Sequence, residues 1–466
     1  MTNLDWIRVD GANLVDSTGA PIRLVGVGLG GWMNMENFIT GYPGNEENIR
    51  RVMLDRMGQE AYDAFFEAFY RDFFDEDDAA HLASLGLNSV RIPVNYRHFE
   101  DDARPFELKE EGFDRLDRVV TLLGRHGIYS ILDLHALPGR QNQHWHSDNP
   151  THIAEFWNHP HFQDRVVHLW EGLAERFKDR PEVAGYNPIN EPSDPSGEVL
   201  PVFYDRLEKA IRAIDSRHVL FLDGNKYSTD FSFLDRRSEP LPNTVYTAHD
   251  YALPGITSAQ EYPGVTRGEY FDRSVVEKTF LRRTEYMRRT GTPIWIGEFG
   301  PVYSQDRSQD SWRYQLLRDQ LEIYREHGAS WALWTFKDIG LQGLVHAAKD
   351  SPYLELIADL VETKGRLGID SWGGSDVGVR SVIDPIDAIF DAEFPDFAPW
   401  PWGRQPHVAV LVRHILLAEP LAERFGDRFR GVSPERAREL ASSFRFDRSV
   451  ERTGLSDVLR SHLAES

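Results

Sequence analysis

The chain has no cysteine among its 466 residues. This excludes disulfide bridges and thiolate metal sites, and it is typical of a reducing compartment. Basic residues are also few, because 52 lysines and arginines stand against 74 aspartates and glutamates, for a net charge of −22. The electrostatic field of this negative charge repels phosphate backbones and anionic membrane surfaces, so we expect neither nucleic acid nor a membrane as a partner.

Long apolar runs are absent as well. No stretch approaches the roughly 20 apolar residues that span a bilayer, and residues 1–10 carry charges where a signal peptide needs an unbroken apolar stretch. We therefore expect a soluble, cytoplasmic protein. The 41% hydrophobic content, with 36 glycines and 26 prolines, indicates a folded globular chain and leaves the oligomeric state open.

A repeated unit organises the chain: an amphipathic helix ends at a glycine, and a β-rich run follows at once. Glycine fits the left-handed residue that closes a helix, as at Gly86, Gly127 and Gly328. Strands are predicted near 23–28, 88–93, 128–134, 183–189, 218–223, 244–249, 293–297 and 330–335. Helices are predicted at 59–85, 112–126, 161–178, 199–215, 274–290 and 311–327.

This alternation predicts a closed parallel sheet, an α/β protein with a (β/α)8 TIM barrel. An open doubly wound sheet is the alternative, but no glycine-rich phosphate-binding turn leads from the first strand into a helix. We expect a single catalytic domain over 1–466. Its parts are a hairpin at about 7–27 that plugs the barrel, a barrel over about 24–418 with its eighth helix near 405–418, and peripheral helices over about 419–466.

Three connections at the carboxyl ends of predicted strands are long: 29–58, 136–160 and 337–400. Loops on that face build the site of a barrel enzyme. The third connection is rich in aromatic residues, among them Trp372 and Trp400, with Trp402 just beyond. We expect this segment to cover the mouth of the barrel.

Polar side chains recur where the predicted strands end. Glu191 follows Asn190 after one strand, and Glu298 ends another. Because the carboxyl ends of parallel strands meet at one face of a barrel, we expect both carboxylates in a single cleft, which is the equipment for cutting a glycosidic bond. The other residues at such ends are Arg91, His135, His249, Tyr251 and Trp334.

As an ordered set, these motifs resemble glycoside hydrolase family five, of the clan of retaining (β/α)8 glycosidases. The motifs are Val90-Arg91-Ile92-Pro93, Leu132-Asp133-Leu134-His135, Ile189-Asn190-Glu191-Pro192, His249-Asp250-Tyr251 and Ile296-Gly297-Glu298-Phe299-Gly300. The resemblance runs from about Leu24 to Lys337. It implies that Glu191 is the acid/base, with a raised pKa, and that Glu298 is the ionised nucleophile.

The resemblance assigns the remaining roles too. Arg91 and Tyr251 would hydrogen-bond Glu298, and Asn190 would bind the sugar 2-hydroxyl. His135 and His249 would belong to the same polar network, and Trp334 would be the platform for the sugar in the cleaved subsite. Retention requires the two carboxyl groups to lie roughly 5 to 5.5 Å apart.

Two further segments are similar to the exo-acting β-1,3-glucanase branch of the family: Gly28 to Trp32 with Glu36, and His135 to Asn142. The similarity makes Glu36 and Asn142 candidates for binding the terminal sugar. It ends at residues 143–148, where Trp145 is a candidate substrate contact and where the preference for glucose is put in doubt. The β-mannosidase branch of the family, which acts on short oligosaccharides, is therefore considered as well.

We expect an exo-acting retaining β-glycosidase that releases a terminal sugar from short oligosaccharides, with β-mannose as the first choice. Exo-β-1,3-glucanase or β-glucosidase activity is the alternative, as is endo-action on a β-1,4-glucan or a mannan. A non-catalytic sugar-binding barrel is remote because both glutamates are present. A metal-dependent barrel hydrolase is also remote, although histidines gather at 144, 146, 152, 159 and 161. We expect no metal and no cofactor.

Overall fold

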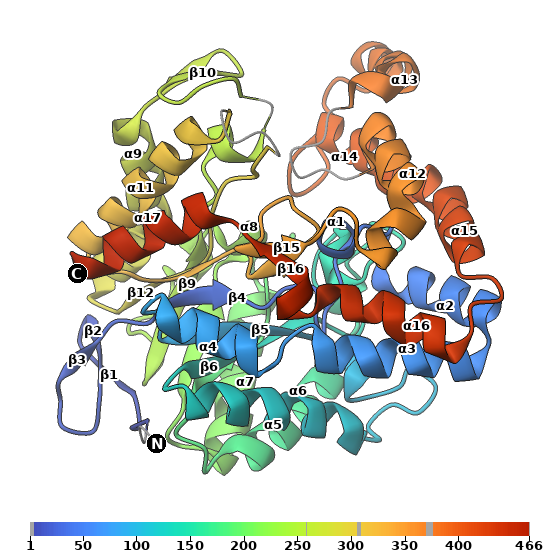
Figure 1. Cartoon of the computed structure of the whole chain (residues 1–466). Helices are drawn as coiled ribbons and strands as arrows, with labels where there is room; N and C mark the ends of the chain where they lie inside the picture. Colours follow the sequence, from blue (N-terminus) through green and yellow to red (C-terminus); the bar gives the residue numbers. More distant parts are fainter. Residues whose placement is uncertain (1–3, 258, 305–308, 370–375, 466) are drawn as a thin grey trace.

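The computed structural model describes residues 4–257, 259–304, 309–369 and 376–465, and its centre is a closed barrel of eight parallel strands (Figure 1). The strands, in order around the barrel, are β4 (Val25–Gly28), β5 (Ser89–Asn95), β6 (Tyr129–Ala136), β7 (Val183–Asn187), β8 (Val219–Asp223), β9 (Thr244–His249), β12 (Ile294–Glu298) and β13 (Ser330–Leu333). Each coincides with a predicted strand. The (β/α)8 prediction is confirmed.

The bottom of the barrel is closed by the start of the chain. β1 (Arg8–Asp10), β2 (Asn13–Val15) and β3 (Pro21–Ile22) form an antiparallel sheet. Ile7 and Leu14 are buried against residues that point from the barrel strands, including Phe221 and Trp295. The predicted hairpin therefore plugs the barrel, and its apolar side chains complete the lower core.

Helices surround the barrel: α4 (Glu76–Ser84), α5 (Glu110–Arg125), α6 (Pro160–Phe177), α7 (Val199–Ile214), α9 (Arg273–Arg283) with α10 (Glu285–Thr290), and α11 (Ser311–Glu326). The helix predicted over 59–85 is in fact two, α3 (Gln59–Asp72) and α4. The break has a local cause, because the side chain of Asp75 accepts from the backbone N–H groups of Asp77 and Asp78 and starts a new helix.

We predicted the eighth barrel helix near 405–418, and this prediction is wrong. That segment forms α14 (Arg404–Val410) and η8 (Leu411–Leu416), which pack beside α13 (Arg380–Glu393) away from the barrel strands (Figure 1). The position belongs to α17 (Thr453–Ala464), which lies along α11. His462 of α17 contacts Trp331 of β13 with ring centroids 6.1 Å apart. The last helix is thus part of the barrel ring, not peripheral.

An outer layer flanks one side of the barrel (Figure 1). Its helices are α2 (Glu46–Met57), α3, α12 (Pro352–Leu367), α15 (Ala418–Arg428) and α16 (Pro434–Ala441), with α15 against α2 and α16 against α3. The smaller elements are α1 (Asn37–Thr40), α8 (Asn225–Ser228), β10 (Gly264–Thr266), β11 (Glu269–Phe271), β14 (Lys337–Asp338), β15 (Val345–Ala347) and β16 (Ser449–Glu451). Within the described part of the chain, no helix combines the length and apolar character required to traverse a bilayer.

A buried lysine joins this layer to the barrel. The ammonium of Lys337 is 2.6 Å from Oδ1 of Asp78, and both side chains are fully buried. The same ammonium donates to the carbonyl oxygens of Phe73 and Phe444, at 2.9 and 2.8 Å. Three segments far apart in the sequence therefore meet at one charge.

We predict that Lys337→Ala lowers the free energy of unfolding by about 3 to 5 kcal/mol, because the carboxylate of Asp78 is left buried without its cation. Chemical denaturation measures this change. The control is Arg236→Ala, which breaks an exposed pair with Glu198 and should cost at most about 1 kcal/mol. Equal losses in the two variants would show that the buried pair does not join the layers as described.

Candidate active site

The centre of the site is the guanidinium of Arg91 in β5, which is fully buried. Its Nη1 donates to Oε1 of Glu298 at 2.5 Å. Nε and Nη2 both donate to Oδ1 of Asn187, at 3.1 and 3.0 Å, and Nη2 also donates to Oδ1 of Asn190 at 2.6 Å. Asp133 lies beside the same cation, with Oδ2 at 3.1 Å from Nη2. One arginine therefore fixes four residues that come from β6, from β7 and its end, and from β12.

Glu298, the last residue of β12, is held at both oxygens. While Arg91 binds Oε1, the hydroxyl of Tyr251 donates to Oε2 at 2.9 Å. A carboxylate that accepts from a guanidinium at one oxygen and from a hydroxyl at the other has a fixed orientation. This geometry is suited to a nucleophile.

Glu191 lies four residues beyond β7, in a strained conformation. Its φ of +46° is in the left-handed region, which costs a non-glycine residue about 1 to 3 kcal/mol. Its backbone N–H donates to Oδ2 of Asp223 at 2.9 Å, which holds the turn. Nδ1 of His249 is 2.6 Å from Oε1, and Nε2 of His146 is 3.1 Å from Oε2. The strain thus places the carboxyl group between two imidazoles.

The two glutamates are close neighbours. An oxygen of Glu191, an oxygen of Glu298 and a ring nitrogen of His249 all lie within 4.8 Å of one another. Nδ1 of His249, besides its contact with Glu191, is 3.5 Å from Oε2 of Glu298. This close approach of the two carboxylates suits retaining glycosidases, whose carboxyl groups are about 5 to 5.5 Å apart.

The protonation of this cluster differs from our expectation. Burial raises the pKa of Glu191, but hydrogen bonds from His146 and His249 outweigh burial and hold that pKa well below its ordinary value. Burial lowers the pKa of His249, whereas the charges of Glu298 and Glu191 raise it, and the net direction is upward. The expected raised pKa of Glu191 is therefore wrong for the free site. Both directions favour an ionised Glu191 beside a protonated His249.

Glu36, His135 and Trp334 are the residues expected to hold the sugar, and we call them the sugar wall of the site. Glu36 is buried, burial raises its pKa, and its Oε1 lies 3.5 Å from Nε2 of His135. Trp334 stacks parallel to His135 at 5.6 Å. Its indole lies so close to the chain that a Cβ at Gly28 or Gly30 would be 2.6 or 2.7 Å from the ring. Both glycines are required for this platform.

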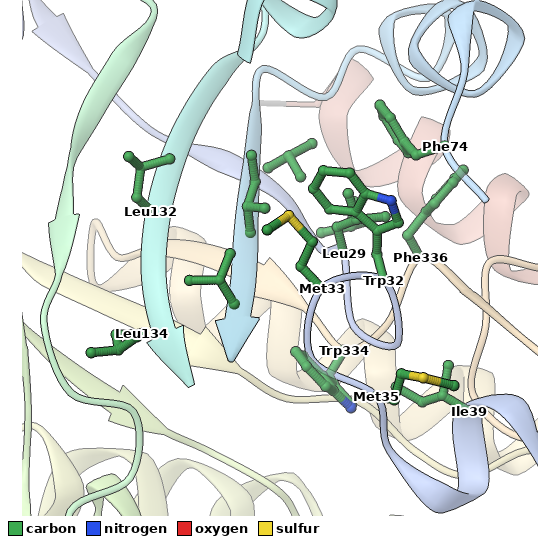
Figure 2. Close-up of a cluster of buried hydrophobic side chains, with 14 of the residues drawn as sticks. Leu29, Trp32, Met33, Met35, Ile39, Phe74, Leu132, Leu134, Trp334 and Phe336 are labelled. Atoms are coloured by element: carbon green, nitrogen blue, oxygen red, sulfur yellow. The ribbon is translucent and has the colours of Figure 1, made fainter. Parts of the chain in front are cut away.

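Apolar side chains support Trp334 from behind. Figure 2 shows its indole next to the loop that carries Met35 and Ile39, with Leu29, Trp32 and Met33 packed farther into the core. Because the interior is close-packed, the platform has little freedom to tilt. The loop after β4 therefore acts as the backing of the sugar wall.

A cavity of about 330 Å³ opens between these walls. Its lining includes Glu36, His135, His144, Trp145, His146, Glu191, Tyr227, His249, Tyr251, Leu253, Ile256, Glu298, Trp334 and Trp402. Trp145 stacks on His144 at 5.2 Å, and its Nε1 has no partner among the described residues. Asn142 instead donates to the carbonyl oxygen of Glu191 at 3.0 Å and lies 2.9 Å from Nε2 of His146, so it positions the acid/base.

Some of these residues were missing from our predicted site. Asp223 ends β8 and follows the same strand-end rule that selected the others, so the sequence contained its signal. From the sequence, His146 is a candidate metal ligand, sugar ligand or solvated loop residue, because nothing local shows that it contacts Glu191. Trp402 was placed at the mouth only as part of an aromatic segment. Trp372 of that segment lies outside the described residues.

The atoms of Glu191, His249 and Glu298 are close enough together to hold a metal ion. Both oxygens of Glu298 already accept hydrogen bonds from Arg91 and Tyr251. Both oxygens of Glu191 face imidazole nitrogens. The donor set therefore satisfies the carboxylates without a metal. Of the five histidines considered for a metal, His144 and His146 stay close, with ring centroids 5.7 Å apart. His146 contacts Glu191, whereas His159 pairs with the exposed Glu155.

The model of the family Cellulase (glycosyl hydrolase family 5) matches residues 45–340. The chain belongs to glycoside hydrolase family 5. It is therefore an O-glycoside hydrolase, and the resemblance inferred from the strand-end motifs is confirmed. The match includes Glu191 and Glu298 but ends before α12, so Trp402 lies outside it.

Several proteins that are similar to this chain carry the names of glycosidases. A protein from Phanerodontia chrysosporium named beta-xylosidase is 46% identical, over 97% of this chain and 97% of its own length. A probable glucan 1,3-beta-glucosidase A from Neosartorya fischeri is 26% identical, over 68% of this chain and 83% of its own. A solved glycoside hydrolase shares the fold, with a TM-score of 0.52 and 20% identity over 68% of this chain and 90% of its own.

We predict that Asp223→Asn moves the basic limb of the pH profile of kcat/KM to lower pH. The buried charge of Asp223 helps to raise the pKa of His249, and Asn removes that charge while its oxygen can still accept from the N–H of Glu191. The proton of the His249–Glu191 pair is then lost at lower pH. The matched control is Asp350→Asn at an exposed position, which should leave the limb in place. A limb that stays or moves upward in Asp223→Asn would refute the proposed proton pair.

Proposed function

We propose that this family 5 enzyme is a retaining, exo-acting β-glycosidase that releases one terminal sugar from a short β-linked substrate. The observation that carries the proposal is the short separation of Glu191 and Glu298 in a small cavity. A volume of about 330 Å³ is at the lower end of ligand pockets. It supports binding of a chain end more than of an extended polysaccharide.

The reaction follows from the contacts. Glu298 attacks the anomeric carbon and forms a glycosyl ester, while the bond from that carbon to the leaving oxygen breaks and Glu191 protonates the oxygen. Water then attacks the ester, Glu191 accepts its proton, and Glu298 is released. As the charge of Glu298 is consumed, His249 loses an interaction that raises its pKa. The proton shared with Glu191 then moves more readily to the leaving group.

We infer xylose as the first candidate for the released sugar. The support is the relative from Phanerodontia chrysosporium, which carries the name beta-xylosidase and aligns over almost the whole of both chains. Glucose is second, because another relative carries the name of a glucan 1,3-beta-glucosidase. The names of these relatives do not include a mannosidase, so mannose, the sugar predicted from the sequence, is the third candidate.

A panel of p-nitrophenyl β-xyloside, β-glucoside and β-mannoside tests the sugar, because the leaving group is the same in all three. We expect kcat/KM to be highest for the xyloside, by about tenfold or more, since one mismatched substituent in a sugar pocket is worth about 1 to 3 kcal/mol. A higher value for the mannoside would restore the prediction from the sequence. A polysaccharide cleaved internally, with none of the three glycosides cleaved, would contradict exo-action.

We predict that Glu298→Ala abolishes turnover, with a fall in kcat of about 10⁴-fold or more, because no ester can form. Azide should restore part of the activity and yield the α-glycosyl azide, which is inverted relative to the substrate. In Glu191→Ala, azide should instead give the β-glycosyl azide, because the ester still forms on Glu298. Glu239→Ala is the exposed control. Wild-type activity of Glu298→Ala would remove this glutamate from the mechanism.

A further inference from the structure

The carboxyl group of Glu191 has to keep its position in two protonation states. In the proposed mechanism it is protonated when the leaving oxygen departs and ionised when water attacks the ester. Its Oε1 is 2.6 Å from Nδ1 of His249, and its Oε2 is 3.1 Å from Nε2 of His146. The support at Oε2 therefore comes from a second imidazole, outside the strand ends.

The ring of His146 is presented to the cavity by a loop with a fixed backbone. His146 is buried and belongs to η2 (Trp145–Ser147), a single turn in the loop after β6. The side-chain amide of Asn34 donates to the carbonyl oxygen of His146 at 3.1 Å. The hydroxyl of Ser147 donates to the carbonyl oxygen of His144 at 2.8 Å. The turn is thus held both from within and from the loop after β4.

A buried carboxylate fixes the end of the same turn. Asp148 follows η2, with Oδ1 accepting from Nδ2 of Asn45 at 2.7 Å and Oδ2 accepting from Nε of Arg97 at 3.0 Å. Asn45 is the residue before α2, and Arg97 lies directly after β5. Because Asp148 is buried, these charge-assisted contacts are shielded from water. Two neighbouring segments therefore hold the loop that carries His146.

The amide of Asn142, which is also buried, has a defined orientation. Its Oδ1 accepts from the backbone N–H of His144 at 3.0 Å, and its Nδ2 donates to the carbonyl oxygen of Glu191 at 3.0 Å. Turning the amide around would break both bonds, so the two backbone groups identify its oxygen and its nitrogen. The same Nδ2 lies 2.9 Å from Nε2 of His146. Its second hydrogen is available for that ring nitrogen.

Nε2 of His146 therefore lies between two groups with different requirements. Nδ2 of Asn142 is a donor, and a lone pair on Nε2 satisfies it. An ionised Oε2 of Glu191 is an acceptor that requires a proton on Nε2, whereas a protonated Oε2 is a donor that requires a lone pair there. A ring with a single proton can carry it on either nitrogen. The imidazole can thus match both states of the carboxyl group.

We propose that His146, with Asn142, is a positioning residue that holds Glu191 both as a proton donor and as a proton acceptor. When Glu191 is ionised, Nε2–H of His146 donates to Oε2. When Glu191 is protonated, the single ring proton is on Nδ1, and Nε2 accepts from Asn142 and from Oε2 until the leaving oxygen takes the acid proton. The proposal rests on the proposed glycosidase function and adds a residue to its acid/base half.

The state of Nε2 tests the proposal without catalysis. In the free wild-type protein, with Glu191 ionised, Nε2 of His146 should carry a proton. In Glu191→Ala, Asn142 is the partner that remains among the described residues, so Nε2 should carry a lone pair. ¹⁵N NMR of the imidazole nitrogens distinguishes the two states, and the signals of His146 are assigned by their loss in His146→Gln. The same state of Nε2 in both proteins would overturn the proposal.

Leaving groups of different acidity test the role in catalysis. Departure of phenolate needs a proton, whereas departure of 2,4-dinitrophenolate needs little help from an acid. His146→Ala should lower kcat/KM by about 10- to 100-fold for phenyl β-xyloside and by less than about threefold for 2,4-dinitrophenyl β-xyloside. Glutamine can turn its amide to present an oxygen or an N–H, so His146→Gln should regain about half of the loss on a logarithmic scale. His159→Ala, which removes an exposed ring paired with Glu155, should keep both values.

Equal losses for the two xylosides in His146→Ala would indicate a merely structural role and would also overturn the proposal. The β-glucosides with the same two leaving groups are assayed in parallel. Failure of the proposed function is recognised separately, because the wild type then hydrolyses none of these glycosides. In that case the ¹⁵N measurement decides alone: a proton on Nε2 that is lost in Glu191→Ala supports the pairing of His146 with Glu191, and an unchanged Nε2 refutes it.

Discussion

The buried guanidinium of Arg91 is the constraint on which the rest of the site depends. A cation removed from water is tolerated only when charges and hydrogen-bond acceptors surround it. In this barrel they come from β6, from β12 and from the end of β7, through Asp133, Glu298 and the two asparagines. The same contacts that solvate Arg91 orient Glu298, the proposed nucleophile, so the stability and the proposed chemistry of the site have one origin.

The acid/base half is organised differently. Glu191 is held by a strained turn, by the carboxylate of Asp223 beneath its backbone and by two imidazoles at its oxygens. Because His249 also lies 3.5 Å from Glu298, its proton affinity depends on the charge of the nucleophile. In the proposed mechanism, this imidazole couples proton transfer to covalent attack on the sugar.

The sequence predicted the barrel well because two strong signals coincide: apolar runs and helices that end at glycine. It also predicted that Glu191, Glu298 and Arg91 meet, since parallel strands bring their carboxyl ends to one face. It failed where a position depends on distant contacts. An amphipathic pattern shows that one face of a helix is buried, but it does not show which element covers that face. For this reason the sequence placed residues 405–418, and not α17, in the ring of helices around the barrel. The contact of His146 with Glu191 likewise depends on how a loop folds.

The central claim is that Glu191 and Glu298 are close enough for Glu298 to form a covalent intermediate. The most direct measurement is ¹H NMR of the sugar released during the first minutes of hydrolysis of a β-glycoside, before mutarotation. The account predicts that the β-anomer appears first and that the α-anomer grows in later. If the α-anomer appeared first, water would attack the substrate directly, and the double displacement on Glu298 would be contradicted.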